Sequence, residues 1–130
     1  MITKDENSEI IDPRAIKGII LFNQKNFFDA HEELELAWRD EHKPIRNLYQ
    51  GILQIGVAYY HIQHRNFTGA KKMFIRAEKW LSPYSGIYKG INIGKLKKDA
   101  AKISRMLKNG ELDGINTSDG ALFPEIETKF

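Results

Sequence analysis

Apolar residues recur at helical spacing along most of this sequence and predict five helices. Asp12 and Pro13 suit an N-cap followed by proline at the first helical position, so the first helix is expected to start there. Asn26 is expected to cap the second helix, and Asn66, which tolerates the left-handed conformation, to end the third. The predicted helices cover residues 13–24, 27–43, 44–64, 67–81 and 95–109.

The third predicted helix is apolar around most of its circumference, which is typical of a buried central helix. Gly51 and Gly56 each cost this helix about 1 kcal/mol relative to alanine, so both indicate close approach by a neighbouring element. One narrow stripe differs, because four polar side chains fall within roughly 60° of arc when successive residues are placed about 100° apart. The stripe consists of Asn47, Gln50, Gln54 and His61.

These elements predict an all-α fold, a single-domain bundle of about five helices built from helical hairpins around a central third helix. Residues 1–12 are a polar N-terminal lead and residues 13–109 are the helical bundle domain. Residues 110–130 are a C-terminal tail without a clear period, which is either loose or draped over the core.

The connections carry two further signals. The stretch 83–94 contains a proline, three glycines and two tyrosines, and it is expected to be a long ordered loop. Residues 24–30 and 64–70 resemble each other at an offset of 40 residues, with matching asparagine, phenylalanine and alanine positions. This internal similarity favours two helical hairpins of similar build.

The second predicted helix carries titratable residues beside its apolar stripe. Its sequence from Phe27 reads FFDAHEELELAWR. His31 falls inside the apolar arc, Glu35 lies one turn further along on the same flank, and Glu32 and Arg39 lie at the edge. A buried charge or imidazole costs several kcal/mol unless it is paired, so this band is expected to meet partners from elsewhere in the chain.

The band allows a metal site. His31 and Glu35 can bind one divalent metal ion from a single helix, with His61 as a third ligand and water in the open position. Glu32 would then be free to act as a general base, and Arg39 to orient an anionic substrate. The spacing resembles the zincin motif, except that Glu35 stands where that motif has its second histidine.

The polar stripe of the third helix allows a small-molecule site. If the second and third helices pack with their polar faces together, the bundle contains a polar pocket with Arg46 at its rim. Arg46 would orient an anionic ligand, and Gln50 and Gln54 would contact it. Trp38, whose ring we assign to the core, is grouped with these three as a ligand-binding residue.

Composition narrows the classes of function. The chain has 130 residues and no cysteine, which excludes cysteine-ligated zinc fingers, iron–sulfur clusters, thiol catalysis and disulfides. The N-terminus lacks an apolar core of signal-peptide length, and no apolar run approaches the ~18 residues of a membrane span. We therefore expect a cytoplasmic protein.

Charge is distributed unevenly along the chain. Residues 1–64 hold 7 Lys and Arg against 10 Asp and Glu, residues 65–108 hold 12 against 2, and residues 109–130 hold 1 against 5. The central basic block either meets phosphate or an acidic partner, or is neutralised by the acidic ends of the protein itself. We do not expect nucleic acid as the partner, because no nucleic-acid motif is recognisable and aromatic residues are not interleaved with the lysines.

Several short motifs together resemble a known family. They are HEELELAWR at 31–39, Arg46, YQGILQIGVAYYH at 49–61 and LSPY at 81–84, and their order and spacing resemble the bacterial and archaeal family called domain of unknown function 309. The resemblance covers roughly residues 16–96 and implies a small all-helical protein. A label given to the family also implies a metal-dependent hydrolase. The signature polar positions of the family correspond to His31, Glu32, Glu35, Trp38, Arg39, Gln50, Gly51 and Gln54.

Two hypotheses of function follow. In the first, the protein binds a small anionic ligand or a divalent metal in a polar site between helices and is a candidate hydrolase. In the second, it is a non-catalytic scaffold in which Glu35 hydrogen-bonds His31 within a structural polar network, and its basic block engages an acidic partner. The sequence is compatible with a homo-oligomer in either case.

Overall fold

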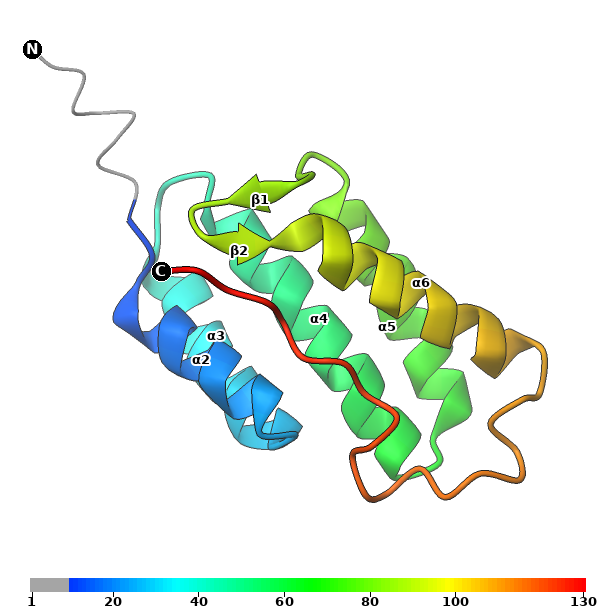
Figure 1. Ribbon diagram of the computed structural model, residues 1–130. Helices are drawn as coiled ribbons and strands as arrows, with labels where there is room; N and C mark the ends of the chain where they lie inside the picture. Colours follow the sequence, from blue (N-terminus) through cyan, green and yellow to red (C-terminus); the bar gives the residue numbers. More distant parts are fainter. Residues whose placement is uncertain (1–9) are drawn as a thin grey trace, which may run out of the picture.

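A computed structural model describes residues 10–130 of the chain. These residues form five helices and one short antiparallel hairpin, so the predicted all-α class is confirmed (Figure 1). The elements are α2 (Pro13–Asn23), α3 (Phe27–Asp40), α4 (Arg46–Gln63), α5 (Phe67–Leu81), β1 (Ile87–Tyr88), β2 (Ile91–Asn92) and α6 (Ile93–Lys108). No helix within the described range is long and apolar enough to cross a membrane.

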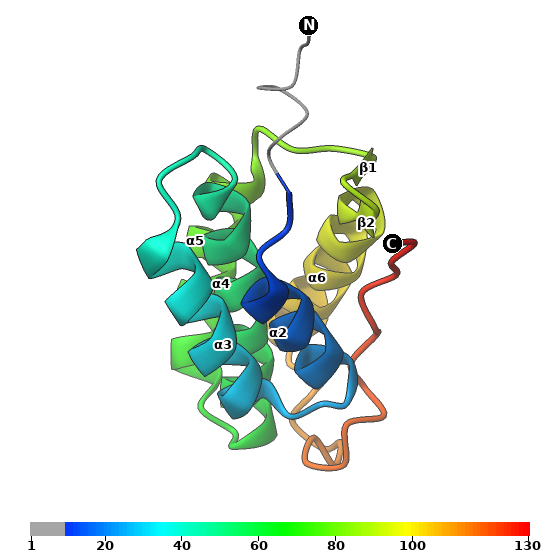
Figure 2. The same ribbon diagram turned by 90° about the vertical axis from the view of Figure 1, so that its left-hand side faces the viewer.

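The helix α4 is the centre of the fold, as predicted. It packs most extensively against α5 and next against α3, and these three helices form one layer (Figure 2). The second layer consists of α2, α6 and the C-terminal tail (Figure 2). The apolar side of α4 faces this second layer, and Tyr49, Ile52 and Tyr59 are completely buried there. Burying each such side chain stabilises the fold by about 1.5–3 kcal/mol.

The turns after α2 and α4 have the same backbone geometry. Lys25 and Arg65 occupy the left-handed region at φ 65° and 56°. The next amide, of Asn26 or Asn66, donates to the carbonyl five residues earlier, at 2.9 and 2.7 Å. This bond is the 6→1 bond of a Schellman motif. The similarity of residues 24–30 and 64–70 therefore corresponds to a repeated hairpin turn.

Two predicted caps differ from the structure. Asn66 does not end α4 in the left-handed region, because Arg65 takes that conformation; the Asn66 side chain instead accepts a hydrogen bond from Gly69 N at 3.0 Å and caps α5. Asn26 forms no such side-chain bond at the start of α3. The two turns differ at the residue that receives the cap, which is Gly69 after Asn66 and Asp29 after Asn26. A Cβ at Gly69 would lie 2.6 Å from the Asn66 amide nitrogen, so the absence of a side chain there leaves room for the cap.

The stretch 83–94 is more regular than the predicted loop. It contains the β1–β2 hairpin, in which Lys89 and Gly90 both have positive φ, as a tight two-residue turn requires. Asn92 accepts a hydrogen bond from Lys95 N and starts α6 at Ile93, two residues earlier than predicted. Strands of two residues are too short to show an alternating pattern, which explains why the sequence did not reveal them.

The predicted ends of two other helices were also wrong. The chain leaves α3 at Asp40 rather than near residue 43, because Glu41 is extended. Residues 43–46 form a turn in which Arg46 N donates to Lys43 O, so α4 begins at Arg46 instead of Pro44. The connection between α3 and α4 is therefore longer than the sequence predicted.

The C-terminal tail is draped over the helices, which was one of the two alternatives left open. It crosses the front of α4 between α2 and α6 (Figure 1). Both amide atoms of Asn23 bond the backbone of Ile126, at 3.0 and 2.7 Å, and Thr117 Oγ1 donates to Ile62 O at 2.8 Å. Phe123 is 98% buried and packs against Tyr59. The tail thus covers the apolar side of α4.

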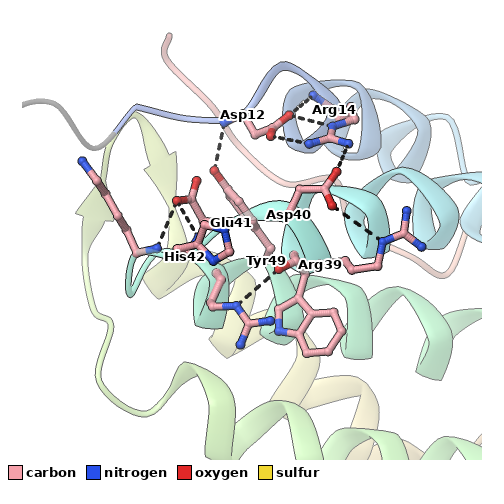
Figure 3. Close-up of polar contacts among 10 residues, drawn as sticks. Asp12, Arg14, Arg39, Asp40, Glu41, His42 and Tyr49 are labelled. Carbon is pink, nitrogen blue, oxygen red and sulfur yellow. Dashed lines mark hydrogen bonds and ion pairs between the residues drawn. The ribbon is translucent and has the colours of Figure 1, made fainter.

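A chain of polar contacts ties α2 to α3 and α4. Asp12 caps α2 by accepting from Arg14 N and also binds the Arg14 guanidinium, which reaches Asp40 at 2.8 Å (Figure 3). The backbone amide of Asp12 donates to the Tyr49 hydroxyl at 2.9 Å. Arg39 lies at the outer end of this chain, with Nε 3.7 Å from Asp40 Oδ1 (Figure 3).

Asp12 is expected to make stability sensitive to acid. The hydrogen bond from the Arg14 side chain, opposed by burial and helped by the Arg14 backbone amide, lowers the pKa of this carboxyl from 3.8. A lowered folded-state pKa gives stability that is present above the unfolded pKa and lost as pH falls through the folded value. Urea unfolding should show Asp12→Ala to be about 0.5–2 kcal/mol less stable at pH 7, with the deficit shrinking in acid. Asp12→Asn, which keeps a capping oxygen, should lose less, and a deficit independent of pH would contradict the assignment.

The two glycines of α4 should respond oppositely to alanine. A Cβ on Gly51 would overlap the buried side chain of Leu81, whereas one on Gly56 would make an ordinary 3.4 Å contact with Phe22. We expect Gly51→Ala to lower the free energy of unfolding by about 1–3 kcal/mol through overpacking. Gly56→Ala should be neutral or gain up to about 1 kcal/mol from helix propensity. Chemical denaturation of both variants tests the difference, and equal effects would exclude a close contact specific to Gly51.

Candidate functional site

The titratable band of α3 faces solvent rather than the core. His31 Nε2 lies 3.6 Å from Glu35 Oε1, and the two side chains are 32% and 53% exposed. Glu32 is exposed as well, and the Arg39 side chain is 62% exposed. We expected this band to be buried and paired with residues from elsewhere in the chain, and that expectation was wrong. The apolar stripe of α3 faces the core, and the charged side chains beside it remain in solvent.

The three proposed metal ligands are not gathered into one group within residues 10–130. His61 is half-buried, and its Nδ1 lies 3.3 Å from the Asn66 amide nitrogen. Burial, and to a lesser extent the neighbouring His64, lowers the pKa of His61. Across residues 10–130, no three His, Asp or Glu side chains are grouped so that they could hold a metal ion. His31 and Glu35 form a pair without His61, so these residues do not fit the divalent metal that the family label implies.

Trp38 and Arg46 form a contact between α3 and α4. The Arg46 guanidinium carbon lies 4.5 Å from the centre of the Trp38 ring, and Arg46 Nε donates to Trp38 O at 3.3 Å. A cation over an indole contributes about 0.5–1 kcal/mol at exposed sites and more when desolvated. The contact fixes the guanidinium at the junction of the two helices, where only its Nε bonds another described residue.

Gln50 and Gln54 continue the same face of α4. They follow Arg46 at intervals of one helical turn, on the side of the helix opposite to Tyr59. Tyr59 contacts Phe22 and Phe123 in the second layer, so the glutamines face away from that layer. We call Trp38, Arg46, Gln50 and Gln54 the α3–α4 polar face.

The polar face contains buried atoms without hydrogen-bond partners. Gln50 Oε1, Gln54 Oε1 and Trp38 Nε1 are each shielded from solvent, and none is paired within residues 10–130. Leaving a buried donor or acceptor unpaired costs about 1–3 kcal/mol. Such groups are rare in native proteins and indicate a strained site, an ordered water or a ligand. The face therefore contains two acceptors and one donor that no described residue pairs, close to the Arg46 guanidinium that lies over Trp38.

Tyr59 is a fourth buried group without a partner, and it lies elsewhere. Its hydroxyl is unpaired within the described residues, and its ring packs among Phe22, Phe27, Phe74 and Phe123. Burial, reinforced by the charge of Asp99, raises the pKa of the Tyr59 phenol. The sequence gives no signal of this group, because a tyrosine in an apolar run does not reveal whether its hydroxyl is paired.

The structure thus divides the nine candidate residues into two groups. Arg46, Gln50 and Gln54 follow one another along one side of α4, and Trp38 contacts Arg46 from α3. The other five are not among the buried unpaired groups: His31, Glu32, Glu35 and Arg39 on α3 are exposed or half-buried, and His61 is half-buried two turns beyond Gln54 on the same side of α4. Only the first group combines burial with unmet hydrogen bonding.

Fold and site define a small all-helical protein of two hairpins with a polar face between α3 and α4. The sequence model of the family described as Domain of unknown function (DUF309) matches residues 15–73, from α2 into α5. The resemblance to this family is therefore confirmed, and the matched segment contains every residue of the polar face.

One curated relative is similar to part of the chain. The chain is 36% identical over 50 residues to the "Uncharacterized protein YpuF" of Bacillus subtilis (strain 168). The match covers 38% of this chain and 29% of YpuF, so the chain spans less than a third of that relative. Neither description assigns an activity.

The exposure of the His31–Glu35 pair predicts a small contribution to stability. Exposed pairs spaced four residues apart on a helix are worth about 0.3–0.5 kcal/mol. We therefore expect His31→Ala and Glu35→Ala each to lower the free energy of urea unfolding by less than about 1 kcal/mol. The double variant serves as the control, because a double-mutant cycle isolates the pair from unrelated effects. A loss of 2 kcal/mol or more in either single variant would restore the hypothesis of a structural network.

Proposed function

We propose that this chain is a binding protein for a small anionic ligand that also carries N–H donors, and that the α3–α4 polar face holds the ligand. The observation that carries the proposal is the set of buried, unpaired atoms Gln50 Oε1, Gln54 Oε1 and Trp38 Nε1. Binding sites commonly combine apolar walls with a few convergent polar groups. Here the two glutamines lie one helical turn apart on α4, the most buried helix, and Trp38 belongs to α3, where its ring contacts Arg46.

Each residue of the face has a role in this proposal. The Arg46 guanidinium, held over Trp38, supplies positive charge and the Nη donors that remain after Nε bonds Trp38 O. The indole N–H donates to the same anionic group. Gln50 and Gln54 accept hydrogen bonds from amine or amide groups of the ligand. Hydrogen bonds between the Arg46 guanidinium and an anionic group are charge-assisted, and such bonds are roughly twice as strong as bonds between neutral groups.

Metal-dependent hydrolysis is not part of the proposal, because His31, Glu35 and His61 do not form a ligand set. The structural-network alternative is less well supported than ligand binding. A satisfied network would pair the glutamine oxygens within the chain, and these oxygens are unpaired within residues 10–130. An ordered water remains the competing occupant, and the experiments below distinguish it from a ligand.

The unpaired glutamines should weaken the ligand-free protein. Methionine has a similar shape and no hydrogen-bonding requirement, so Gln50→Met and Gln54→Met should leave the free energy of unfolding unchanged or raise it by up to about 2 kcal/mol. Gln63→Met on the same helix is the matched control, since no atom of Gln63 is among the buried unpaired groups. Guanidinium unfolding measures all three. A loss of 1–3 kcal/mol in the first two variants only would show that water or protein groups satisfy the glutamines.

Ligand binding should depend on the same residues. Thermal unfolding is measured with amino acids, N-acetyl amino acids, dicarboxylates and nucleoside monophosphates, because these classes vary the anionic group and the N–H donors separately. A ligand present at 100 times its dissociation constant stabilises the folded protein by about 2.7 kcal/mol. The rise in melting temperature should be lost in Gln50→Met, Gln54→Met and Arg46→Met and kept in Gln63→Met. A shift kept in all four variants would place the ligand elsewhere.

A further inference from the structure

A groove of about 270 Å³ runs between α5 and α6. These two helices contact each other much less than α5 contacts α4, and the small side chains of Ala77, Ala100 and Ala101 leave the space between them unfilled. The floor is apolar and includes Ile55 of α4, Phe74 and Leu81. Ile75 stands at the lip with 59% of its surface exposed. The groove is separate from the α3–α4 polar face and shares no residue with it.

One wall of the groove is positively charged. Lys97, Arg105 and Lys108 line it from α6, and Glu78 is the sole acidic residue among its lining residues. From residue 97 to residue 108 a helix rises about 16 Å. The cations therefore extend along the groove rather than gathering at one point.

The positive charges on this wall are not neutralised by carboxylates within residues 10–130. Lys97 Nζ donates to Leu81 O and Tyr84 O, at 3.2 and 2.7 Å, and so covers the end of α5. Arg105 and Lys108 form no ion pair with any residue in the range 10–130. The acidic tail binds elsewhere: Arg65, for example, is held by the backbone carbonyls of Asp113 and Ile115.

We propose that the α5–α6 groove binds an acidic amphipathic helix of a partner protein. Apolar side chains on one face of that helix, spaced at i, i+3 or i+4 and i+7, fill the space above the three alanines. Aspartates or glutamates beside them meet Arg105 and Lys108. This proposal does not depend on the ligand proposed for the α3–α4 polar face.

The lining favours a helix over other anionic partners. Nucleic acid needs phosphate contacts together with exposed aromatic rings or hydrogen-bonding groups for its bases, and this floor offers aliphatic side chains and a 92% buried Phe74. A long-chain carboxylate carries a single charge and would meet only one of Arg105 and Lys108. An acidic helix can meet both of these cations and fill the space above the apolar floor.

The test starts from a library of random 16-residue peptides displayed on phage, selected on the full chain and counter-selected on Ala101→Trp. Ala101 is exposed at the groove, so tryptophan there blocks the space without entering the core. Circular dichroism confirms that the variant is folded. We expect the enriched peptides to be net acidic with helical apolar spacing. Enrichment of basic or unpatterned peptides, or of peptides that bind Ala101→Trp equally well, overturns the proposal.

Charge reversal then locates the binding site. The dissociation constant of an enriched peptide is measured by fluorescence anisotropy for Arg105→Glu/Lys108→Glu and for Lys98→Glu/Lys102→Glu. Both pairs change the net charge equally on the same helix, but Lys98 and Lys102 do not line the groove. The groove pair should weaken binding at least tenfold and the control pair less than threefold. Equal weakening would mean that general charge attraction holds the peptide, which overturns the proposal.

Two other occupants are tested in parallel. Dodecanoate and a single-stranded oligonucleotide compete with the peptide, and analytical ultracentrifugation measures self-association. Displacement by dodecanoate at stoichiometric concentration would assign the groove to a lipid-like carboxylate instead. A dimer that disappears in Ala101→Trp would assign it to a second copy of the chain. Neither competition nor dimerisation is expected.

Discussion

The structure depends on the burial of α4 between α3 and α5. This helix supplies the largest group of buried residues among the described helices, and its contact with α3 is the most extensive one between the two hairpins. The close fit at Gly51, where Leu81 occupies the space of a side chain, brings α5 near enough to shield α4 from one side. The tail completes the enclosure, because Thr117 satisfies the Ile62 carbonyl near the end of the helix. Without this tight packing, neither the polar face nor the groove would be held in place.

The same burial explains why polar residues on α4 are unusual. A glutamine on a surface helix is hydrated and costs nothing, whereas Gln50 and Gln54 lose water because α3 and α5 flank them closely. Native proteins tend to tolerate unfavourable local features, such as unpaired polar groups, at functional sites and to offset their energetic cost elsewhere in the fold. Here the compensation is the extensive aromatic packing around Tyr59 on the opposite side of the helix.

The helices could be predicted because each buries a continuous apolar stripe, which appears in the sequence as apolar residues at helical spacing. Features that depend on the orientation of a single side chain could not be predicted. Asn26 and Asn66 occupy equivalent turns, yet only Asn66 caps its helix. The β hairpin depends on two residues with positive φ, of which only Gly90 gives a clear signal. Helix ends near residues 40 and 46 were set by local turns that periodicity does not detect.

The burial of the candidate residues could be predicted to a different degree for each helix. On α4 the narrow polar stripe interrupted an otherwise apolar surface, so its exceptional residues were visible in the sequence. On α3 the angular position of His31 and Glu35 left their burial undecided, because a shift of a few tens of degrees in helix rotation separates a buried band from an exposed one. The groove between α5 and α6 was not predicted, since it arises from the separation of two helices rather than from a motif.

The α3–α4 polar face and the α5–α6 groove share no residue, but Leu81 of α5 lies close to both. Leu81 lines the groove and also fills the space above Gly51, which is adjacent in sequence to Gln50. A displacement of one side chain is transmitted to its neighbours in a close-packed core, because such a core has few alternative arrangements. A helix in the groove would press on Leu81 and hold α5 against α4, thereby holding α4 in the position that aligns Arg46, Gln50 and Gln54. Coupling between the sites, if both are occupied, would therefore pass through the contact that also sustains the fold.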